Sequence, residues 1–298
     1  MNTNFPLPPA ELESRLKTSP FDIVAMEPAG HGVMGAKKLA IVFRDDHRHA
    51  LDVKWKEAPA GGDGWNNSPR REIGVYEVQK LFLDPDDYVV PPVAVRGIEF
   101  DIYRAIRADP SANINGARCV YGALAVWLRH ATKPDHAYDR VLLLRNPRYA
   151  YHFGNLNLLH YLVQHRDARA SNFARSTDPD NPQVFSIDNG IAFGGTVYNV
   201  FTRHFDKIRV RSLPQQSIAR LQAVSDADLQ RLGVLSELRD DGAGVLRHVA
   251  PGHNLDPEMG NRMRPGVVQI GLTSREIAAV ARRIRRLLGR DRGRFSTF

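Results

Sequence analysis

The stretch YLVQHRDARASNFARSTDPDNPQVFSIDNGIAFG, residues 161–194, decides how the rest of this chain is interpreted. Asn172 follows Asp167 by five residues, and Asp188 comes sixteen residues later, behind a short apolar run. Amide and carboxylate oxygens suit Mg²⁺, which proteins hold through one or two side chains plus phosphate oxygens. A carboxylate ahead of them can orient or deprotonate a hydroxyl. The pattern predicts phosphoryl transfer; the plainer alternative is a polar loop, a buried strand and an Asx turn at 188–190.

The composition limits the class of protein and the number of domains only broadly. The chain has 298 residues, 43% hydrophobic and 25% charged, which is ordinary for a soluble globular protein of one large or two small domains. No apolar run approaches the roughly 18 residues that a membrane-spanning helix needs. Residues 1–16 lack the basic and apolar regions of a secretory signal, so none is expected.

Cysteine content and charge narrow the environment and the partners. Cys119 is the single cysteine, so an internal disulfide framework and a cysteine-based zinc site are excluded and a reducing compartment is favoured. We expect a cytoplasmic protein, with attachment to a membrane surface or non-classical secretion as alternatives. The net charge of +8 suits a nucleotide, an anionic lipid or an acidic protein. No nucleic-acid partner is expected.

A glycine-rich segment lies near the start of the chain. Gly30, Gly32 and Gly35 spell GxGxxG after the predicted strand 21–26. A dinucleotide-binding domain would open a helix here, whereas the β-rich segment 38–43 follows. The glycines are therefore predicted to lie in a hairpin that covers phosphates, or in a plain glycine-rich hairpin.

Residues 50–56 alternate with the period of two that a strand requires. Leu51, Val53 and Trp55 share one face, and Lys54 and Lys56 share the other. A lysine on a strand beneath a glycine loop can pair with α- and β-phosphates. Strand parity does not distinguish the two lysines, and both could simply be solvated.

Residues 70–82 have helical spacing, with Glu72 in the first turn. A carboxylate there favours the helix dipole, or it can pair with the strand lysine and fix it for phosphate binding. Glu77 is the alternative. The strands predicted at 93–95 and 100–106 would complete an N-lobe, residues 20–118, of five strands and one helix after a leader at 1–19.

The apolar segment 119–124 is predicted to lead into a helix through Leu128. Val120 and Tyr121 would then form a hinge that offers backbone groups to adenine. The glycine- and proline-rich segment 240–265 is predicted to be a mobile loop. Helices are predicted around the following segments: 142–144, 155–164, 215–223, 226–232 and 274–288.

The glycine loop, strand lysine, helix glutamate and Asp-xxxx-Asn with its later Asp occur in the order of one architecture. The chain resembles the protein-kinase-like superfamily, in the atypical branch of phosphatidylinositol 3-/4-kinases and HipA-type kinases. Residues 186–193, SIDNGIAF, resemble the metal segment of type II phosphatidylinositol 4-kinases. Residues 72–76 (EIGVY) with 90–92 (VPP), and 53–57 (VKWKE), resemble the helix and lysine strand of that group, which favours Lys54 over Lys56. The resemblance covers residues 20–215.

This resemblance implies an α+β, two-lobed protein-kinase-like fold with a β-rich N-lobe, one main helix there, and a mostly helical C-lobe at 119–298. It implies ATP and Mg²⁺ or Mn²⁺ as cofactors. The implied roles are phosphate covering by Gly30, Gly32 and Gly35; phosphate binding by Lys54, held by Glu72; orientation of the hydroxyl by Asp167; metal binding by Asn172 and Asp188; and, more weakly, contact with the transferred phosphate by Arg169.

The resemblance has departures. Asp52 stands where typical protein kinases keep a small apolar residue, the metal segment is DNG and not DFG, and no APE-like motif follows. We therefore expect an atypical ATP-dependent kinase that acts on a hydroxyl of a protein or phosphoinositide. The alternatives are a small-molecule phosphotransferase of the aminoglycoside or choline kind, a nucleotide-binding pseudokinase, and an enzyme that transfers AMP.

The end of the chain is rich in arginine. A solvated helix face is one interpretation, and contact with an anionic membrane or an acidic partner is the other. The arginines concerned are Arg282, Arg283, Arg285, Arg286, Arg290, Arg292 and Arg294.

Overall fold

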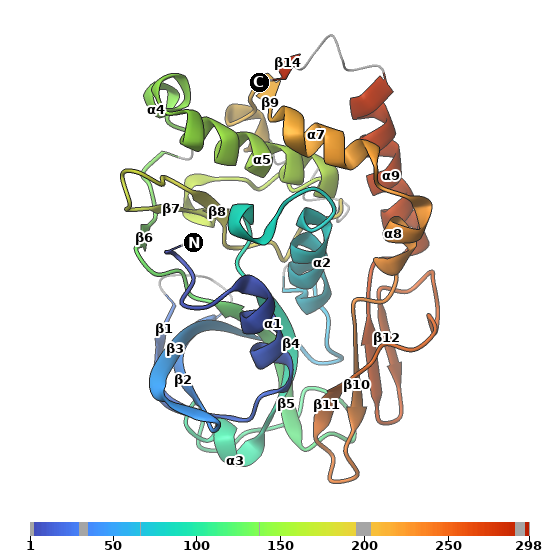
Figure 1. Ribbon diagram of the computed structural model, residues 1–298. Helices are drawn as coiled ribbons and strands as arrows, with labels where there is room; N and C mark the ends of the chain where they lie inside the picture. Colours follow the sequence, from blue (N-terminus) through green and yellow to red (C-terminus); the bar gives the residue numbers. More distant parts are fainter. Residues whose placement is uncertain are drawn as a thin grey trace.

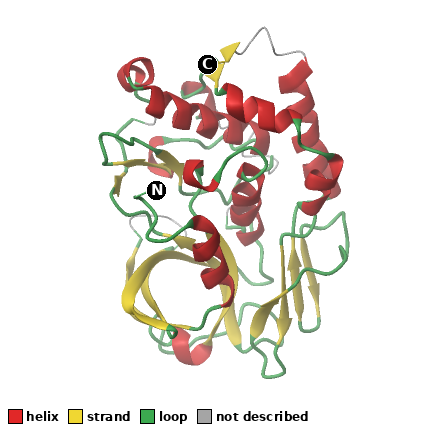
Figure 2. Ribbon diagram, in the orientation of Figure 1, coloured by secondary structure: helices red, strands yellow, loops and turns green. Residues whose placement is uncertain are grey.

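A computed structural model of the chain describes residues 3–29, 35–65, 67–136, 138–194, 204–289 and 296–297. A curled sheet forms one end of the molecule, helices form the other, and a second sheet lies beside the first (Figures 1 and 2). Among the described residues, no helix is long and apolar enough to cross a bilayer.

The first sheet is antiparallel and has the strand order β1-β2-β3-β5-β4. Its inner face forms a core in which Leu39, Val53 and Trp55 are almost wholly buried, as the period of two predicted. The strands are β1 (Phe21–Pro28), β2 (Lys37–Phe43), β3 (Asp46–Glu57), β4 (Val93–Glu99) and β5 (Cys119–Val126).

Helix α1 (Pro9–Thr18) belongs to this lobe and is more than a leader. Its Leu12 and Leu16 are fully buried in the core of the sheet, and the helix packs on β4. Helix α2 (Pro69–Gln79) lies between the sheet and the helical lobe (Figure 1). A 3₁₀ turn, η1 (Pro85–Asp87), and the short helix α3 (Phe100–Tyr103) complete the lobe.

Two predictions about this lobe are wrong. Residues 100–106 were expected to form a strand but contain α3, and residues 119–126 form β5 instead of leading into a helix. A short apolar run fits a buried strand and a buried helix equally well, and here it pairs with both β3 and β4. The predicted lobe boundary at residue 119 therefore cuts through the first sheet.

The helical lobe is built around α5 (Pro147–Val163), which is apolar on most of its surface and mostly buried, as expected for a helix inside a core. Asn146 caps its first turn by accepting from the Tyr149 N–H. The remaining elements are α4 (Arg140–Arg145), β6 (Ala131–Thr132), η2 (Ala170–Asn172), β7 (Phe173–Ser176), β8 (Val184–Ser186), η3 (Phe205–Lys207), β9 (Ser212–Leu213), α7 (Gln215–Gln222), α8 (Asp226–Arg231), α9 (Ser274–Gly289) and β14 (Ser296–Thr297).

The segment predicted to be a mobile loop contains two strands, β11 and β12, of a four-stranded antiparallel sheet with the order β11-β10-β13-β12. Its edge strand β11 lies against β4, where the His248 imidazole contacts the Val95 carbonyl at 2.6 Å. That prediction is wrong because the strands are only four or five residues long and polar on their exposed face. The strands are β10 (Ser236–Asp240), β11 (Leu246–Val249), β12 (Asn261–Arg264) and β13 (Val267–Ile270).

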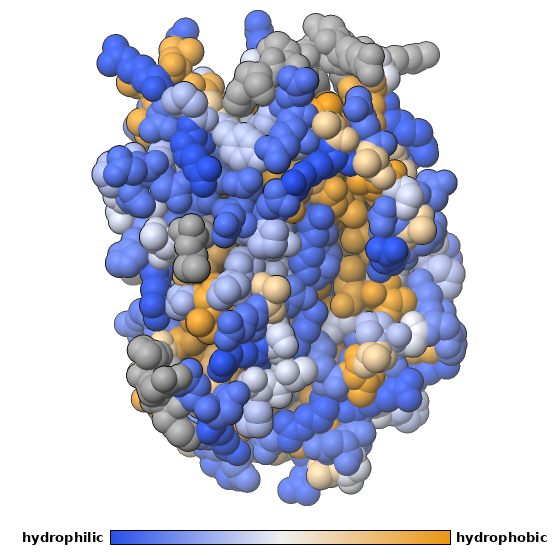
Figure 3. Space-filling model, in the orientation of Figure 1, coloured by the Kyte–Doolittle hydropathy of each residue, from blue (hydrophilic) through white to orange (hydrophobic). Residues whose placement is uncertain are grey.

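On the face shown in Figure 3, apolar side chains gather in a groove between α2 and α8. Leu81, Val224, Leu232 and Leu235 contribute to its lining. The surface around the groove is mostly hydrophilic.

Candidate active site

The catalytic-loop motif begins where α5 ends. Gln164 takes a left-handed conformation, with φ of 52°, and turns the chain so that His165 is buried. The His165 Nε2 lies 2.8 Å from the Asp188 carbonyl oxygen, and because a carbonyl can only accept, Nε2 carries the proton. Burial lowers the pKa of His165, so a neutral imidazole ties the loop to the metal segment.

Asp167 is 5% exposed and sits at the turn of this loop. Asn172 donates its Nδ2 to the Asp167 carbonyl oxygen at 2.7 Å, and Arg169 Nη2 lies 3.5 Å from Asp167 Oδ2. Among the described residues, Asp167 Oδ1 has no hydrogen-bond partner, since His204 Nε2 is 3.9 Å away, beyond hydrogen-bond distance. One oxygen of a buried carboxylate is therefore available as an acceptor.

The two predicted metal ligands are neighbours because of the β7–β8 hairpin. Phe173 pairs with Ser186, and the Ile187 N–H donates to the Asn172 carbonyl at 3.0 Å. Asp188 follows directly, at the same end of the hairpin. Because the Asn172 amide nitrogen is directed at Asp167, its Oδ1 is the atom left for a cation, with only a long 3.3 Å contact from Ser171 Oγ. An amide and a carboxylate oxygen fit Mg²⁺ or Mn²⁺.

The helix glutamate is held by Lys56, so the assignment of Lys54 as its partner is wrong. Lys56 Nζ lies 2.5 Å from Glu72 Oε1 and 2.5 Å from Asp188 Oδ1. The first turn of α2 lies opposite the end of β3, nearer position 56, and strand parity alone could not reveal this. Burial opposes the charge of Lys56, but Glu72 and Asp188 outweigh burial and raise its pKa.

Neighbouring charges also determine the protonation state of Asp188. Burial alone would raise the pKa of its carboxyl, but Lys56 and then Lys54 hold that pKa well below its usual range. The Asp188 carboxylate is therefore ionised, the form in which it can bind a cation.

Lys54 lines the neighbouring cleft and donates to the Ile187 carbonyl at 2.9 Å. Burial, and then repulsion by Lys56, lower its pKa to about 8. Glu72 also accepts from the Asn189 N–H through Oε2 at 3.1 Å, so one carboxylate joins β3, α2 and the metal segment. Glu77, the alternative glutamate, pairs with Lys80 at 2.7 Å instead.

The cleft between the two lobes is mainly apolar near its hinge. Val120 and Tyr121, predicted to form that hinge, are instead fully buried in the cores, because β5 continues to Val126. Residues 125–128, a few positions further along the chain, line the cleft. The other lining residues include Ala29, Val90, Pro91, Val93, Ala131, Thr132, Lys133, Ala174 and Ile187.

The structure describes only part of the glycine loop. Gly30 and Gly32 lie outside the described residues, and Gly35 has φ of +65°, where glycine is favoured. The Ala29 N–H donates to the Ala36 carbonyl at 3.0 Å, so β1 and β2 form the predicted hairpin. Its position beside the cleft follows from Ala29, which lines it.

Sequence reasoning missed two supports of this site. Arg70, at the start of α2, pairs with Glu276 of α9 at 2.9 Å and Asp63 at 3.0 Å. At Gly74, a Cβ would come within 2.9 Å of the Phe193 ring, so glycine lets the metal segment pack closely on α2. Two neighbouring arginines at the helix start were a visible signal, but the Glu276 partner of Arg70 is 206 residues away.

Comparisons with known proteins address the fold. A scan against protein-family models finds no match, and a search of curated proteins finds no significant one. Solved structures do match. A hydra Fam20 solved with sugar has a TM-score of 0.55 at 14% identity, covering 92% of this chain and 85% of its own.

Two structures of the Golgi casein kinase match in the same way, each at 14% identity and covering 94% of this chain. One has a TM-score of 0.54 and 73% coverage of its own chain; the other, with Mn and ADP bound, has 0.52 and 74%. The narrower likeness to phosphatidylinositol and HipA-type kinases remains a prediction. With its two lobes, its cleft and these structural neighbours, the chain has a protein-kinase-like fold.

Proposed function

We propose that this protein is an ATP-dependent kinase that uses Mg²⁺ or Mn²⁺ and transfers the γ-phosphoryl group to a hydroxyl of a protein acceptor. The observation that carries the proposal is the buried Asp167 carboxylate, whose Oδ1 has no donor among the described residues. The Asp167 backbone carbonyl accepts a hydrogen bond from Asn172, and Asn172 lies at the same end of the β7–β8 hairpin as Asp188.

Each residue of the site has its own role in the proposed phosphoryl transfer. Asp167 orients the acceptor hydroxyl and takes its proton through Oδ1, as general bases do. Lys56, fixed by Glu72, supplies positive charge to the phosphates, and Asn172 and Asp188 hold the metal ion. When bound, that ion neutralises charge that develops on the phosphoryl oxygens. Arg169 lies beside Asp167 and adds a further positive charge on the side of the acceptor.

The cleft must open to admit a nucleotide. It measures about 120 Å³ between the described residues, whereas small-molecule sites begin at about 300 Å³. In this closed arrangement Lys56 bridges Glu72 and Asp188 directly. Movement of the lobes would replace the Asp188 contact by phosphate and metal, while the Glu72 contact could persist.

A protein acceptor is favoured over the phosphoinositide that the sequence resemblance suggested. The structural neighbours include a kinase named for casein, a protein, which supports a protein acceptor. The pseudokinase alternative is disfavoured because the lysine, the glutamate, the asparagine and both aspartates are all present and lie close together.

Labelled ATP offered to pools of protein, phosphoinositide and small-molecule acceptors tests the proposal. We expect metal-dependent labelling in the protein pool, abolished by excess chelator and by Asp188→Ala. Asp180→Ala, which removes an exposed carboxylate from the same region, is the matched control. Labelling that survives in chelator, or an Asp188→Ala variant as active as Asp180→Ala, would contradict it.

A further inference from the structure

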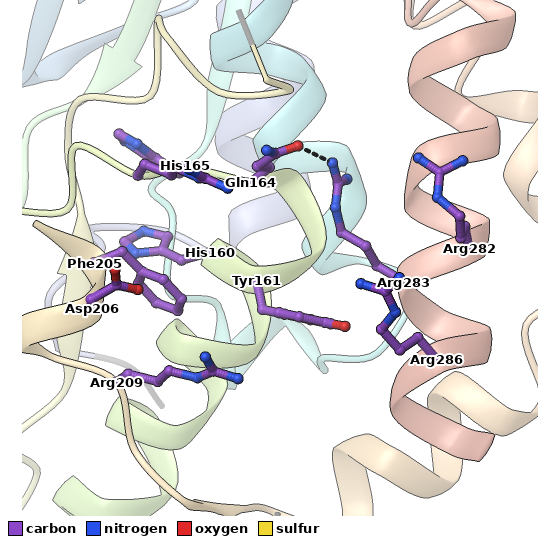
Figure 4. A pocket seen from close by; sticks show the side chains of 11 residues that line it. His160, Tyr161, Gln164, His165, Phe205, Asp206, Arg209, Arg282, Arg283 and Arg286 are labelled. Atoms are coloured by element: carbon purple, nitrogen blue, oxygen red, sulfur yellow. Dashed lines mark hydrogen bonds between the residues drawn. The ribbon is translucent and has the colours of Figure 1, made fainter. Parts of the chain in front are cut away.

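A cavity of about 600 Å³ lies behind the catalytic loop, between α5, the segment around η3, and α9. Figure 4 shows Arg283 and Arg286 extending from α9 toward α5, with Arg209 on the other side of Tyr161. None of its lining residues lines the nucleotide cleft. The lining consists of His160, Tyr161, Gln164, His165, Arg166, Phe205, Asp206, Arg209, Arg282, Arg283 and Arg286.

Positive charge dominates this cavity. Five arginines line it, and among the described residues Asp206 is its single carboxylate. Burial, and then repulsion by Arg282, lower the pKa of Arg283 to about 10. Charges of one sign gathered in a concave site focus the potential there and attract counter-ions. The cavity is therefore built to receive negative charge.

One of these arginines has a structural role that fixes the geometry. Arg283 donates through Nη1 to the Leu162 carbonyl at 2.7 Å and through Nη2 to Gln164 Oε1, which joins α9 to the end of α5. Cations suit the negative end of a helix. Arg282 and Arg286, four residues apart, are carried on the same helix, where like charges at this spacing repel.

The shape of the cavity distinguishes a small molecule from a surface. A volume of about 600 Å³ lies within the range of about 300–1,000 Å³ typical of small-molecule sites. Guanidinium groups bind phosphate oxygens through paired, charge-assisted hydrogen bonds. Arginines directed into a concavity suit clustered phosphoryl groups better than a flat bilayer, which would favour outward-directed side chains.

We propose that this cavity binds a compact, soluble polyanion that carries several phosphoryl groups. The site is separate from the nucleotide cleft and goes beyond the proposed kinase activity. Its lining includes His165 and Arg166, the residues that immediately precede Asp167.

Isothermal titration with inositol hexakisphosphate as the probe tests the site, in metal-free buffer and both without and with excess ADP. Arg282→Gln with Arg286→Gln removes two cavity charges from exposed helix positions. Arg275→Gln with Arg285→Gln removes two exposed charges of α9 that lie outside the cavity. We expect affinity to fall about tenfold or more in the first double variant and to stay close to wild type in the second. Added salt should weaken binding.

Several results would overturn the proposal. These are no binding to wild type, an equal loss in both double variants, and displacement of the probe by ADP. Binding only to vesicles that contain phosphatidylinositol bisphosphate, and not to the soluble probe, would assign the arginines to a membrane surface instead. The Asp188→Ala variant should bind the probe normally, so failure of the kinase proposal would leave this test unaffected.

Discussion

Lys56 lies between the carboxylates of Glu72 and Asp188. Its side chain is almost as buried as the residues of the hydrophobic cores. A buried cation of this kind is stabilised only while its partners remain. Removing it would leave two carboxylates close together without compensation. Lys54, two residues away on the same face of β3, contacts only a backbone carbonyl among the hydrogen bonds of its amine. The two lysines should therefore respond differently to the same substitution.

We predict that Lys56→Met lowers the free energy of unfolding by about 3 kcal/mol and reduces single-turnover phosphotransfer by about two orders of magnitude or more. Lys54→Met is the matched control and should affect both quantities less, because the Lys54 amine donates to a backbone carbonyl and makes no direct hydrogen bond to a carboxylate. Chemical denaturation and single-turnover assays on both variants provide the measurement. A larger loss of transfer in Lys54→Met would restore the assignment that the sequence favoured.

Acid–base behaviour separates the lysines in the wild-type protein. The pKa of Lys54 is about 8, so its charge is lost as the pH rises through 8, whereas the raised pKa of Lys56 keeps it charged. If Lys56 is the phosphate lysine, ATP affinity should be nearly constant between pH 7 and 9. A fall in affinity centred near pH 8, measured calorimetrically, would instead implicate Lys54.

Helix α2 is the element that carries Glu72, and it is anchored at both ends. Arg70 ties its start to Glu276 of α9. Near its other end, Tyr76 and Lys80 both donate to Glu13 of α1, at 3.1 and 2.8 Å. These contacts come from the two ends of the chain and hold the helix against the cleft. Elements near both termini thus set the position of Glu72.

We expect Arg70→Ala to lower the free energy of unfolding by about 3 kcal/mol, because Glu276 and Asp63 lose a buried partner. The double variant with Glu276→Gln should be less destabilised than the sum of the single changes. Transfer should fall because Glu72 lies half a turn away on the same helix. Arg71→Ala, whose guanidinium donates to the Trp65 carbonyl, is the control. Additive effects would show that Arg70 and Glu276 are not coupled.

Elements with a clear period were predictable from the sequence. The alternation at Leu51, Val53 and Trp55 gave the faces of β3, and α7, α8 and α9 lie within a residue or two of their predicted bounds. The failures have physical causes: β5 depends on pairing with β3, which is far away in the chain, and the strands of the β10–β13 sheet are too short to show a clear period. A short segment does not encode its partner, so local patterns could not identify those strands.

At the scale of the whole molecule, the candidate site was predictable where it depends on local spacing. Asp167, Asn172 and Asp188 lie on one loop and one hairpin, so their order along the chain brings them together. The partner of Glu72 and the lining of the cleft depend on how β3, α2 and β5 approach one another. Strand parity could not distinguish Lys54 from Lys56 as the partner of Glu72. The hinge was predicted at Val120 and Tyr121 because β5, which continues to Val126, was not expected there.

The central claim is that Asp167 acts on the acceptor hydroxyl while other groups hold the nucleotide. Asp167→Asn preserves the shape of the side chain but removes its basicity. Positioned acid–base groups contribute roughly 10²- to 10⁴-fold to rate. The most direct measurement pairs calorimetric ATP affinity, in Mn²⁺ or Mg²⁺, with single-turnover phosphotransfer on the same preparations of wild type and Asp167→Asn. The account predicts affinity within a few-fold of wild type and transfer reduced by about two orders of magnitude or more; transfer unchanged in Asp167→Asn, or tight ATP binding without any transfer in wild type, would contradict it.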